Sequence, residues 1–369
     1  MTDERLIFNG INAATGNSPK GTMPEGPELC PGMILLDQWR LVRELGRGTL
    51  GVVYEAVELH LGGTVALKIL DPGIRYRPES LERFRRTVAA MRAVIHPRIV
   101  RVFDYREQVA PPLALVSMEY VKGGCVRQLR DLARETEQPI PLRLALTILA
   151  QTLDALAAAH AHDLVHGNVT PGNVLLAGGT ATELLADPGR DPEVRLADLG
   201  FAVDRGASSP YAAPEALRTE EPVRPAADVY SAGALFYDLL TGSPPTIPVR
   251  LPDDVPPAVA TLLLRLLDRD PARRPLAARL LEWLTHPTSI SAPAIPREGL
   301  ILTAAKDSDR GRRIFGNVLL GIGGLLDLGG TPRSRTRLTV TEALARDWRK
   351  LGHDFHLAIQ RTVRDAAKS

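Results

Sequence analysis

Short apolar runs open the patterned part of the chain. Val, Leu, Ile and Tyr alternate or cluster between glycines in segments 40–46, 51–58 and 63–70. Runs of this kind, rich in β-branched and aromatic residues and bounded by turn residues, are typical of β-strands. The pattern therefore predicts three consecutive strands.

Helical spacing replaces strand alternation farther along the chain. Segment 80–95 has a helical pattern, and Pro78 just before it suits a helix start. From Pro141 onward apolar residues recur at spacings of three and four, which predicts an amphipathic helix. A mostly β first part thus precedes a mostly helical second part. The residues that carry the second helical pattern are Ala145, Ile148, Leu149, Leu153 and Leu156.

Changes in composition indicate the domain boundaries. From Asn9 to Gly32 the chain is rich in Gly, Pro, Asn, Thr and Ser, with too little apolar surface to offset the entropy cost of ordering. We expect a flexible leader at residues 1–35 and a compact domain at residues 36–287. A linker with a short apolar, Gly-rich segment is expected at residues 288–337.

The last segment, residues 338–369, has the pattern of an amphipathic helix. Thr339 and Glu342 are spaced as a capping box. Five apolar residues fall on one helical face, and such a stripe more often packs within a protein than it binds a partner. The stripe comprises Leu344, Trp348, Leu351, Phe355 and Ile359.

An uncharged run lies within the predicted linker. Residues 314–326 include four glycines, and the run is shorter than the about 20 apolar residues that a spanning helix needs. No transmembrane span is predicted. Residues 301–369 carry 13 Lys or Arg against 7 Asp or Glu. A weak contact of this C-terminal segment with an anionic membrane surface is one expectation, and packing on the main domain is the other.

Composition narrows the class of protein. Hydrophobic residues make up 44% and charged residues 24% of the 369, which excludes wholesale disorder, collagen and coiled coil. A net charge of +2 provides no global field for nucleic acid, so no nucleic-acid partner is expected. Cys30 and Cys125 form neither a disulfide framework nor a metal-ligand spacing. With no apolar signal-peptide run near the N-terminus, we expect a cytoplasmic protein.

The first chemical motif is a glycine triplet. Gly46, Gly48 and Gly51, followed by Val53, form a G-x-G-x-x-G-x-V pattern. The glycines lie between two strand-like segments instead of opening a helix, which argues against a dinucleotide-binding turn. Lys68 follows on the next predicted strand. A glycine hairpin lets backbone amides approach phosphates, and the lysine can place a cation on them.

Further motifs follow in order along the chain: Ser117-Met118-Glu119-Tyr120-Val121, Val165-His166-Gly167-Asn168-Val169-Thr170-Pro171-Gly172-Asn173, Ala197-Asp198-Leu199-Gly200, Ala213-Pro214-Glu215, Asp228-Val229-Tyr230-Ser231-Ala232-Gly233 and Asp270-Pro271-Ala272-Arg273-Arg274-Pro275. With the glycine triplet and Lys68, this series resembles the protein kinase family, closest in texture to bacterial eukaryotic-like Ser/Thr kinases. The resemblance implies an α+β, two-lobed protein kinase fold. Its N-lobe would be β-rich with one helix, and its C-lobe mainly helical.

The resemblance also implies the ligands, which are ATP and Mg²⁺ in this family. The backbone of Glu119 and Val121 would meet adenine, with Met118 at the gatekeeper position. Asn173 and Asp198 hold the two metal-facing positions. The implied nucleotide-binding residues are Gly46, Gly48, Gly51, Val53, Ala66, Lys68, Met118, Glu119 and Val121.

Three structural details follow from the same resemblance. Arg274 is expected to form a buried ion pair with Glu215. Residues 177–193 are longer than the family's usual hairpin, and we expect a solvent-exposed extension near the active-site mouth. Gly167 replaces an arginine that grips an activation-loop phosphate in many kinases, so regulation by loop phosphorylation at Ser208, Ser209 or Thr219 is not expected.

Three positions depart from the family pattern. Asn168 stands where the family has the Asp that accepts the proton of the attacking hydroxyl. Thr170 stands where a Lys would touch the transferring phosphate. Thr87 stands where the helix after Lys68 would carry the Glu that pairs with that lysine.

These substitutions favour loss of catalysis with retention of binding. A neutral carboxamide can orient a hydroxyl but has no lone pair basic enough to take its proton. The sequence therefore predicts an ATP-binding pseudokinase with weak or absent activity and a regulatory or scaffolding role toward protein partners. The alternative is an active atypical Ser/Thr protein kinase that transfers the γ-phosphate of ATP to protein hydroxyls, with Asn168 orienting the hydroxyl.

Overall fold

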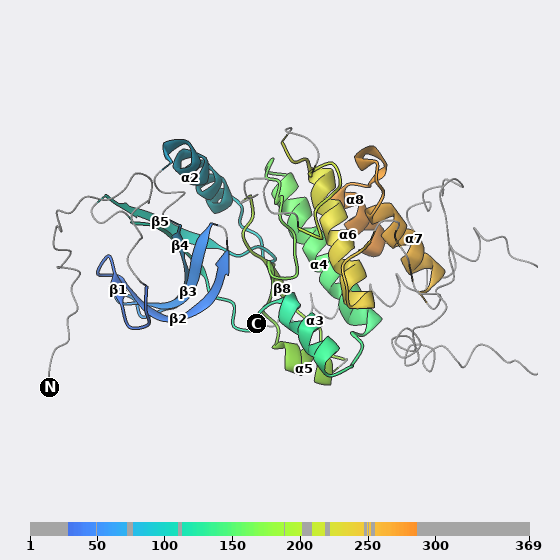
Figure 1. The fold of residues 1–369 in the computed structure, drawn as a ribbon, viewed down its shortest axis with the longest axis horizontal. Helices are drawn as coiled ribbons and strands as arrows, with labels where there is room; N and C mark the ends of the chain where they lie inside the picture. Colours follow the sequence, from blue (N-terminus) through green and yellow to red (C-terminus); the bar gives the residue numbers. More distant parts are fainter. Residues whose placement is uncertain are drawn as a thin grey trace, which may run out of the picture. The chain divides into compact units, whose positions relative to one another are not determined.

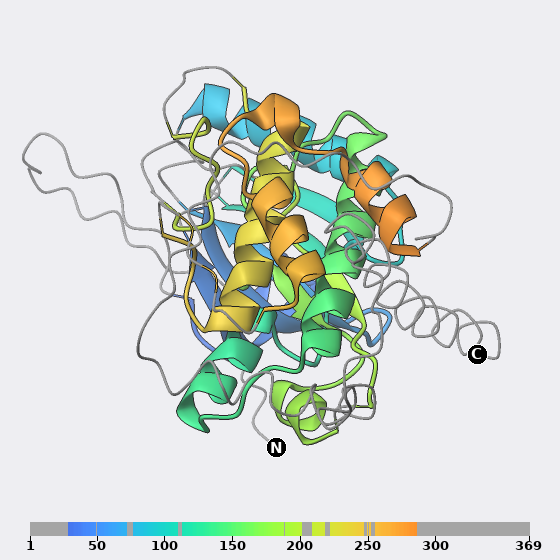
Figure 2. The ribbon, with the colours of Figure 1, turned by 90° about the vertical axis from the view of Figure 1, so that its right-hand side faces the viewer.

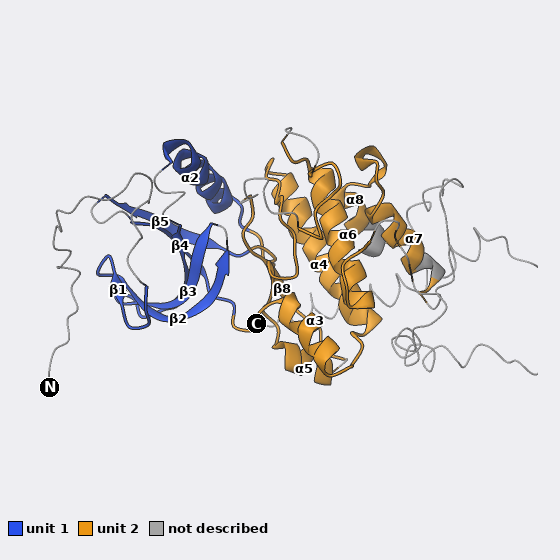
Figure 3. Cartoon of the chain, in the orientation of Figure 1, with its two compact units in different colours: residues 1–95, 100–121 blue, residues 96–99, 122–369 orange. Residues whose placement is uncertain are grey.

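The structure is a computed structural model that describes residues 29–48, 50–71, 77–109, 113–187, 189–200, 209–217, 222–246, 249, 251 and 255–285. The chain divides into two compact units (Figure 3). Unit 1 comprises residues 1–95 and 100–121, and unit 2 comprises residues 96–99 and 122–369. The predicted linker at 288–337 and the predicted helix at 338–369 lie outside the described residues.

Unit 1 is built on a six-stranded antiparallel sheet with the strand order β1-β2-β3-β4-β6-β5 (Figure 1). The three strands predicted from the sequence form its β2, β3 and β4. Helix α2 follows β4 along the chain and packs against β5. The elements of unit 1 are β1 (Ile34–Leu35), β2 (Trp39–Gly48), β3 (Gly51–Glu58), β4 (Thr64–Leu70), α2 (Pro78–Ala93), β5 (Val102–Gln108) and β6 (Leu113–Glu119).

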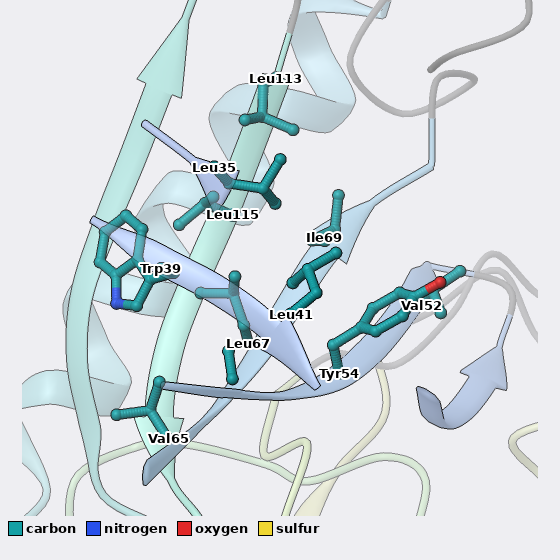
Figure 4. Close-up of a cluster of buried hydrophobic side chains, with 11 residues drawn as sticks. Leu35, Trp39, Leu41, Val52, Tyr54, Val65, Leu67, Ile69, Leu113 and Leu115 are labelled. Carbon is teal, nitrogen blue, oxygen red and sulfur yellow. The ribbon is translucent and has the colours of Figure 1, made fainter. Parts of the chain in front are cut away.

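One face of this sheet carries a cluster of buried apolar side chains (Figure 4). Alternate residues along each strand contribute to it, because successive side chains of a strand point to opposite faces. We call this surface the core face. Its buried members are Leu35, Trp39, Leu41, Val52, Tyr54, Ala56, Val65, Leu67, Ile69, Leu113 and Leu115.

The sheet begins earlier than the sequence pattern predicts. Strand β1 pairs with β2, and the partly buried side chains of Leu29 and Met33 pack against the core face. Residues 34–35 therefore belong to the sheet and Leu29 and Met33 pack against it, so the predicted flexible leader at 1–35 is wrong for residues 29–35. Their few apolar side chains gain burial on a surface made by later strands, which local composition does not reveal.

Helix α2 begins at Pro78, where the missing backbone N–H of proline costs nothing. Phe84, Val88 and Met91, spaced at four and three residues, are its buried side chains. The ring of Phe84 lies 6.0 Å from the ring of Tyr105 on β5. Apolar packing thus fixes one side of α2 to the sheet.

An ion pair also fixes α2 to β5. Arg85 donates from Nε and Nη2 to the two carboxylate oxygens of Glu107, at 2.7 and 2.5 Å. The hydroxyl of Tyr105 donates to the same carboxylate. Bidentate geometry specifies orientation as well as distance, so Arg85 helps set the rotation of α2 about its axis.

Unit 2 is built around two long buried helices, α4 and α6, which pack side by side (Figure 2). Helix α8 packs against α4, and α7 packs against α6. Strands β7 and β8 form a two-stranded antiparallel sheet. The elements of unit 2 are α3 (Val126–Glu135), α4 (Leu142–His160), β7 (Val174–Leu176), α5 (Ala181–Ala186), β8 (Val194–Leu196), α6 (Pro225–Thr241), α7 (Pro257–Leu266), η1 (Pro271–Arg273) and α8 (Ala277–Thr285).

Helices α4 and α6 are buried because both are apolar around most of their circumference. Among the described residues, α4 is also the one helix long and apolar enough to span a membrane. Its apolar window is 78% buried inside the protein, which is typical of a core helix. The helical pattern that begins after Pro141 therefore marks the centre of unit 2.

The extra residues between β7 and β8 form a packed element. Thr180 and Glu183 make a capping box that starts α5. Leu184 and Leu185 of this helix are buried, and α5 packs on α3. The expectation of a solvent-exposed extension at 177–193 is therefore wrong for α5, because its two leucines need an apolar neighbour.

The residues that lead from α5 to β8 are held by polar contacts. Gln151 of α4 donates to the Pro192 carbonyl at 2.8 Å and accepts from the Val194 amide at 2.8 Å. Arg143 of α4 pairs with Asp191. These bonds satisfy backbone groups that would otherwise be buried without partners.

Close packing at Gly233 predicts a sensitive position in the core of unit 2. A Cβ placed there would lie 2.5 Å from Cβ of Leu266 on α7. We expect Gly233→Ala to lower the free energy of unfolding by about 1–3 kcal/mol, because overpacking a tight core forces shifts. Urea denaturation of the full chain measures this change.

Gly63→Ala is the matched control for Gly233→Ala, because a Cβ at Gly63 meets nothing within 4 Å. Its unfolding free energy should stay within about 0.5 kcal/mol of wild type. Equal stability of the two variants would contradict the tight α6–α7 packing.

Candidate functional site

The candidate residues fall in both units. In unit 1, the β2–β3 hairpin carries the glycine triplet, with Gly48 paired to Gly51 at its end. Gly51 has φ +141°, and a Cβ there would lie 2.0 Å from the Ile69 carbonyl oxygen. No other residue type fits this position. Around Gly46 and Gly48 a Cβ would meet nothing within 4 Å, so space on this hairpin is left open.

Lys68 lies on the sheet face opposite the core face. It pairs across the sheet with Val53 of β3 and Val116 of β6, and Ala66 pairs with Met118. Residues opposite each other in a ladder share a face, as do residues two apart on one strand. Four of the predicted nucleotide-binding residues, Val53, Ala66, Lys68 and Met118, therefore lie on one surface, which we call the ligand face.

Two hydrogen bonds between Glu119 and Arg101 anchor the segment that follows β6. The backbone amide of Glu119 donates to the Arg101 carbonyl at 2.8 Å, and the Arg101 amide donates to the Glu119 carboxylate at 3.3 Å. Tyr120 and Val121 follow, both half-buried. This segment, residues 119–121, contains the backbone groups expected to meet adenine, and we call it the hinge.

In unit 2, the loop at residues 166–173 is anchored by Asp228 in the first turn of α6. Asp228 is 1% exposed. Its carboxylate accepts from the His166 amide at 2.8 Å and from the Gly167 amide at 2.7 Å, and it contacts His160 Nε2 at 2.8 Å. Gly167 has φ +72°, a left-handed conformation that glycine adopts without strain.

His166 ties the loop to the end of β8. Its Nδ1 accepts from the Asn168 amide at 3.2 Å, so the ring proton belongs on Nε2, which donates to the Ala197 carbonyl at 2.9 Å. Complete burial lowers the pKa of His166 below its usual value. The ring is therefore neutral and structural at neutral pH.

The remaining loop residues are held by short-range bonds. Asn173 Nδ2 donates to the Asn168 carbonyl at 2.8 Å, and the Asn173 amide donates to the Thr170 carbonyl at 3.0 Å. The Ala197 amide donates to the Asn173 carbonyl at 2.8 Å. Together these bonds bring Asn168, Thr170 and Asn173 beside the segment that carries Asp198.

Asn173 and Asp198 suit a hard divalent cation. Because the Asn173 amide nitrogen is used within the loop, its side-chain oxygen is the atom left for coordination. Asp198 follows Ala197 with φ +58°, a left-handed conformation that costs about 1 kcal/mol or more at a non-glycine residue and is retained mainly at functional positions. Carboxylate and carbonyl oxygens are the ligands that Mg²⁺ prefers, so these two residues fit the implied metal.

A sequence profile described as "Protein kinase domain" matches residues 39–284. This chain belongs to the protein kinase family. The predicted fold class is confirmed, with an N-terminal antiparallel sheet and helix followed by a helical C-terminal region.

Two curated relatives of this kinase-family chain are bacterial serine/threonine-protein kinases by name. It is 33% identical over 310 residues to serine/threonine-protein kinase PknB of Mycolicibacterium smegmatis, an alignment covering 75% of this chain and 48% of that protein. It is 34% identical over 261 residues to serine/threonine-protein kinase PknA of Mycobacterium tuberculosis, covering 66% of this chain and 59% of that protein. The chain thus spans about half the length of these relatives.

Within the kinase domain, the ion pair predicted between Glu215 and Arg274 is present. Arg274 Nη1 and Nη2 donate to the two Glu215 oxygens at 2.5 and 2.8 Å. The guanidinium also donates to the Asp268 and Ala226 carbonyls and lies 4.9 Å from the centre of the Tyr230 ring. The buried arginine therefore joins the segment after the activation loop to α6 and η1.

The helix of the kinase N-lobe carries no acid at the family's glutamate position. Thr87 stands there, half-buried on α2. Glu82, the nearest acid before it on the helix, pairs with Arg85 and Arg86 at 3.4 Å. Helix α2 is instead oriented by Arg85 and Glu107, as described above. Residues 201–208 and 218–221, with Ser208 and Thr219, lie outside the described residues.

Sequence reasoning missed the roles of Asp228, His160 and His166 in this kinase domain. The carboxylate of Asp228 accepts from two amides of the loop that lie 61 and 62 residues before it in sequence, and it also contacts His160. His166 holds the loop through its buried ring. The available signal was an aspartate in the first turn of a helix that is otherwise almost wholly apolar. Such a buried charge needs several donors to offset its desolvation.

The buried neutral ring of His166 predicts a pH dependence of stability. Below about pH 6.5 the unfolded chain protonates this residue while the folded protein resists it, so stability is full above that pH and falls as pH drops toward the lowered folded pKa. The slope can reach about 1.4 kcal/mol per pH unit. Urea denaturation between pH 7.5 and 5.5 measures it.

His166→Gln removes the titrating ring while keeping donor and acceptor atoms. We expect it to be less stable than wild type at pH 7.5 but to lose less stability on acidification. Parallel stability curves for the two proteins would show that His166 does not cause the dependence.

Proposed function

We propose that this protein is an ATP-binding pseudokinase with a regulatory or scaffolding role. The observation that carries the proposal is Asn168 at the base position of a catalytic loop that is otherwise held in place by Asp228, His166 and Asn173. The loop's order is retained while the group that would accept a proton is absent.

The chemical deficit can be estimated. General-base catalysis contributes about 10²- to 10⁴-fold in rate, and an amide side chain cannot supply it. Thr170 removes a cation that would stabilise charge developing on the transferring phosphate, a further loss of about 10²-fold or more. Both deficits lie in one loop, so chemistry is affected more than binding.

The binding residues support nucleotide recognition. Val53, Ala66, Lys68 and Met118 share the ligand face, and Gly51 is required by the geometry of the hairpin. Asn173 and Asp198 supply oxygens suited to Mg²⁺. ATP with Mg²⁺ is therefore the ligand we propose, with protein partners as the targets of regulation in the cytoplasm.

A second candidate is an active atypical Ser/Thr protein kinase. The relatives favour it, since both are serine/threonine-protein kinases by name. The ordered loop favours it too, because phosphoryl transfer passes through a loose transition state in which alignment contributes much of the rate. In this candidate Asn168 orients the attacking hydroxyl without taking its proton.

Nucleotide binding predicts a thermal shift. Saturating ATP with Mg²⁺ should stabilise the full chain by about 2.7 kcal/mol at 100 times the Kd. Lys68→Ala should weaken the shift, and Asp198→Ala should remove its dependence on Mg²⁺. Gly63→Ala serves as a control that keeps the full shift. No shift at millimolar ATP would contradict the proposed ligand and leave a scaffold without nucleotide.

Restoring the family residues separates the two candidates. We expect the double substitution Asn168→Asp with Thr170→Lys to raise phosphate transfer to a generic protein substrate by about 10²-fold or more. Thr64→Lys, at an exposed position of β4, controls for added charge. Wild-type transfer at kinase-like rates that Asp198→Ala abolishes, with little gain in the double variant, would establish the second candidate instead.

A further inference from the structure

Three polar side chains of unit 1 form a closed cluster, the hinge triad, made of Arg43 on β2, Glu55 on β3 and Tyr120 directly after β6. Arg43 Nη2 donates to the Tyr120 hydroxyl at 2.9 Å, and that hydroxyl donates to Glu55 Oε2 at 2.9 Å. Arg43 Nη2 also lies 2.8 Å from Glu55 Oε2. Each member therefore contacts the other two.

A β-bulge places Arg43 in this cluster. Leu41 pairs with Ala56 on the core face, and after a register shift at Val42 the next pair is Arg43 with Glu55. Without the extra residue, Leu41 and Arg43 would point to the same face, because side chains alternate with a period of two. The bulge turns Arg43 away from the core face, which is the usual effect of bulges that re-aim a side chain.

The triad lies at the edge of the ligand face. Glu55 pairs with Ala66, and Ala66 pairs with Met118. The next row of the sheet along the strands contains Val53, Lys68 and Val116. Tyr120 follows Met118 by two residues, so it lies one row beyond the Met118 row, on the side away from Lys68.

The triad is partly shielded from water. Glu55 is 18% exposed at its side chain, whereas Arg43 is 58% exposed, so water screens the pair in part. Bonds to charged groups are about twice as strong as bonds between neutral groups. Burial, and then the Glu55 contact, raise the pKa of Tyr120. Its hydroxyl therefore keeps the proton that it donates.

We infer that Tyr120 is a positioning residue for adenine-nucleotide binding, whose hydroxyl fixes the hinge backbone at 119–121 relative to the β2–β3 hairpin that carries the glycine turn. This inference rests on the proposed function, because the hinge backbone is the part of the family's site that meets adenine. The bonds join the strands under the glycine turn directly to the hinge. Loss of the hydroxyl should loosen the base end of the site and leave the phosphate end unchanged.

The test is Tyr120→Phe in the full chain, with titration calorimetry of ATP, adenosine and inorganic tripolyphosphate. Affinity for ATP and adenosine should fall about three- to tenfold, the size of one ordinary hydrogen bond, because the triad is partly exposed to water. Affinity for tripolyphosphate should not change, because this probe has no base. A role in stability alone would weaken all three ligands or none.

Tyr54→Phe is the matched control. Tyr54 neighbours Glu55 on β3, but its ring lies on the core face and its hydroxyl donates to the Leu29 carbonyl at 3.1 Å. This variant loses the same hydroxyl atom, from the strand that carries Glu55, and should bind all three probes as wild type does. An equal loss of adenosine affinity in Tyr54→Phe and Tyr120→Phe would overturn the inference.

Hydrogen exchange of the ligand-free protein provides a second readout. The amides of residues 119–121 should exchange faster in Tyr120→Phe than in wild type, while those of β5 stay unchanged. Equal affinity of wild type and Tyr120→Phe for adenosine would overturn the positioning role and leave the proposed function standing. If wild type binds no nucleotide, the proposed function fails. In that case, equal exchange of the amides of residues 119–121 in Tyr120→Phe and wild type would also overturn the hold of the triad on the hinge. Faster exchange in Tyr120→Phe would support it.

Discussion

The carboxylate of Asp228 is the constraint on which the catalytic loop depends. A buried carboxylate is costly unless donors surround it, and here two consecutive loop amides and one imidazole do so. The same bonds that stabilise Asp228 fix the backbone of His166 and Gly167. This fixed backbone sets the positions of Asn168, Thr170 and Asn173 farther along the loop. The bond from His166 to the Ala197 carbonyl ties the loop to the residue directly after β8. The position of Asp228 is set in turn by α6, one of the two most buried helices of unit 2.

This dependence separates the shape of the loop from the chemistry at positions 168 and 170. The bonds described for residues 166–173 run through backbone groups and the side chains of Asp228, His166 and Asn173. In the proposed pseudokinase, Asn168 and Thr170 would therefore change the chemistry of the loop without removing any of these contacts. The order of the loop is consistent with both candidate functions, so the side-chain chemistry at these two positions distinguishes them.

Local pattern was sufficient for much of the fold. Strands β2, β3 and β4, helix α2 and helix α4 follow from periodicity and turn residues, and the Glu215–Arg274 pair follows from the family's motif order. The residues of the ligand face were predicted from the resemblance to protein kinases, through the order of the motifs along the chain. The placement of nucleotide and metal at these residues remains a prediction.

Features that depend on distant neighbours were not predictable. Leu29, Met33 and Leu35 gain their burial from strands that come later in the chain, and the leucines of α5 from α3. The Arg85–Glu107 pair joins residues 22 apart across a helix and a strand. The bulge at Val42 is set by the pairing of β2 with β3, which no local signal in β2 specifies. In each case tertiary packing decides the conformation of a segment whose own composition is ambiguous.

The attachment of α2 has a consequence for signalling. A ligand shifts a conformational equilibrium only by the difference in its affinity for the two states. Thr87 carries no charge, so it cannot form with Lys68 the ion pair that in this family joins the helix to the nucleotide-binding lysine. The Arg85–Glu107 pair holds α2 on the side of β5 instead. A nucleotide held by Lys68 would therefore have no such ion pair through which to favour one position of α2 over another.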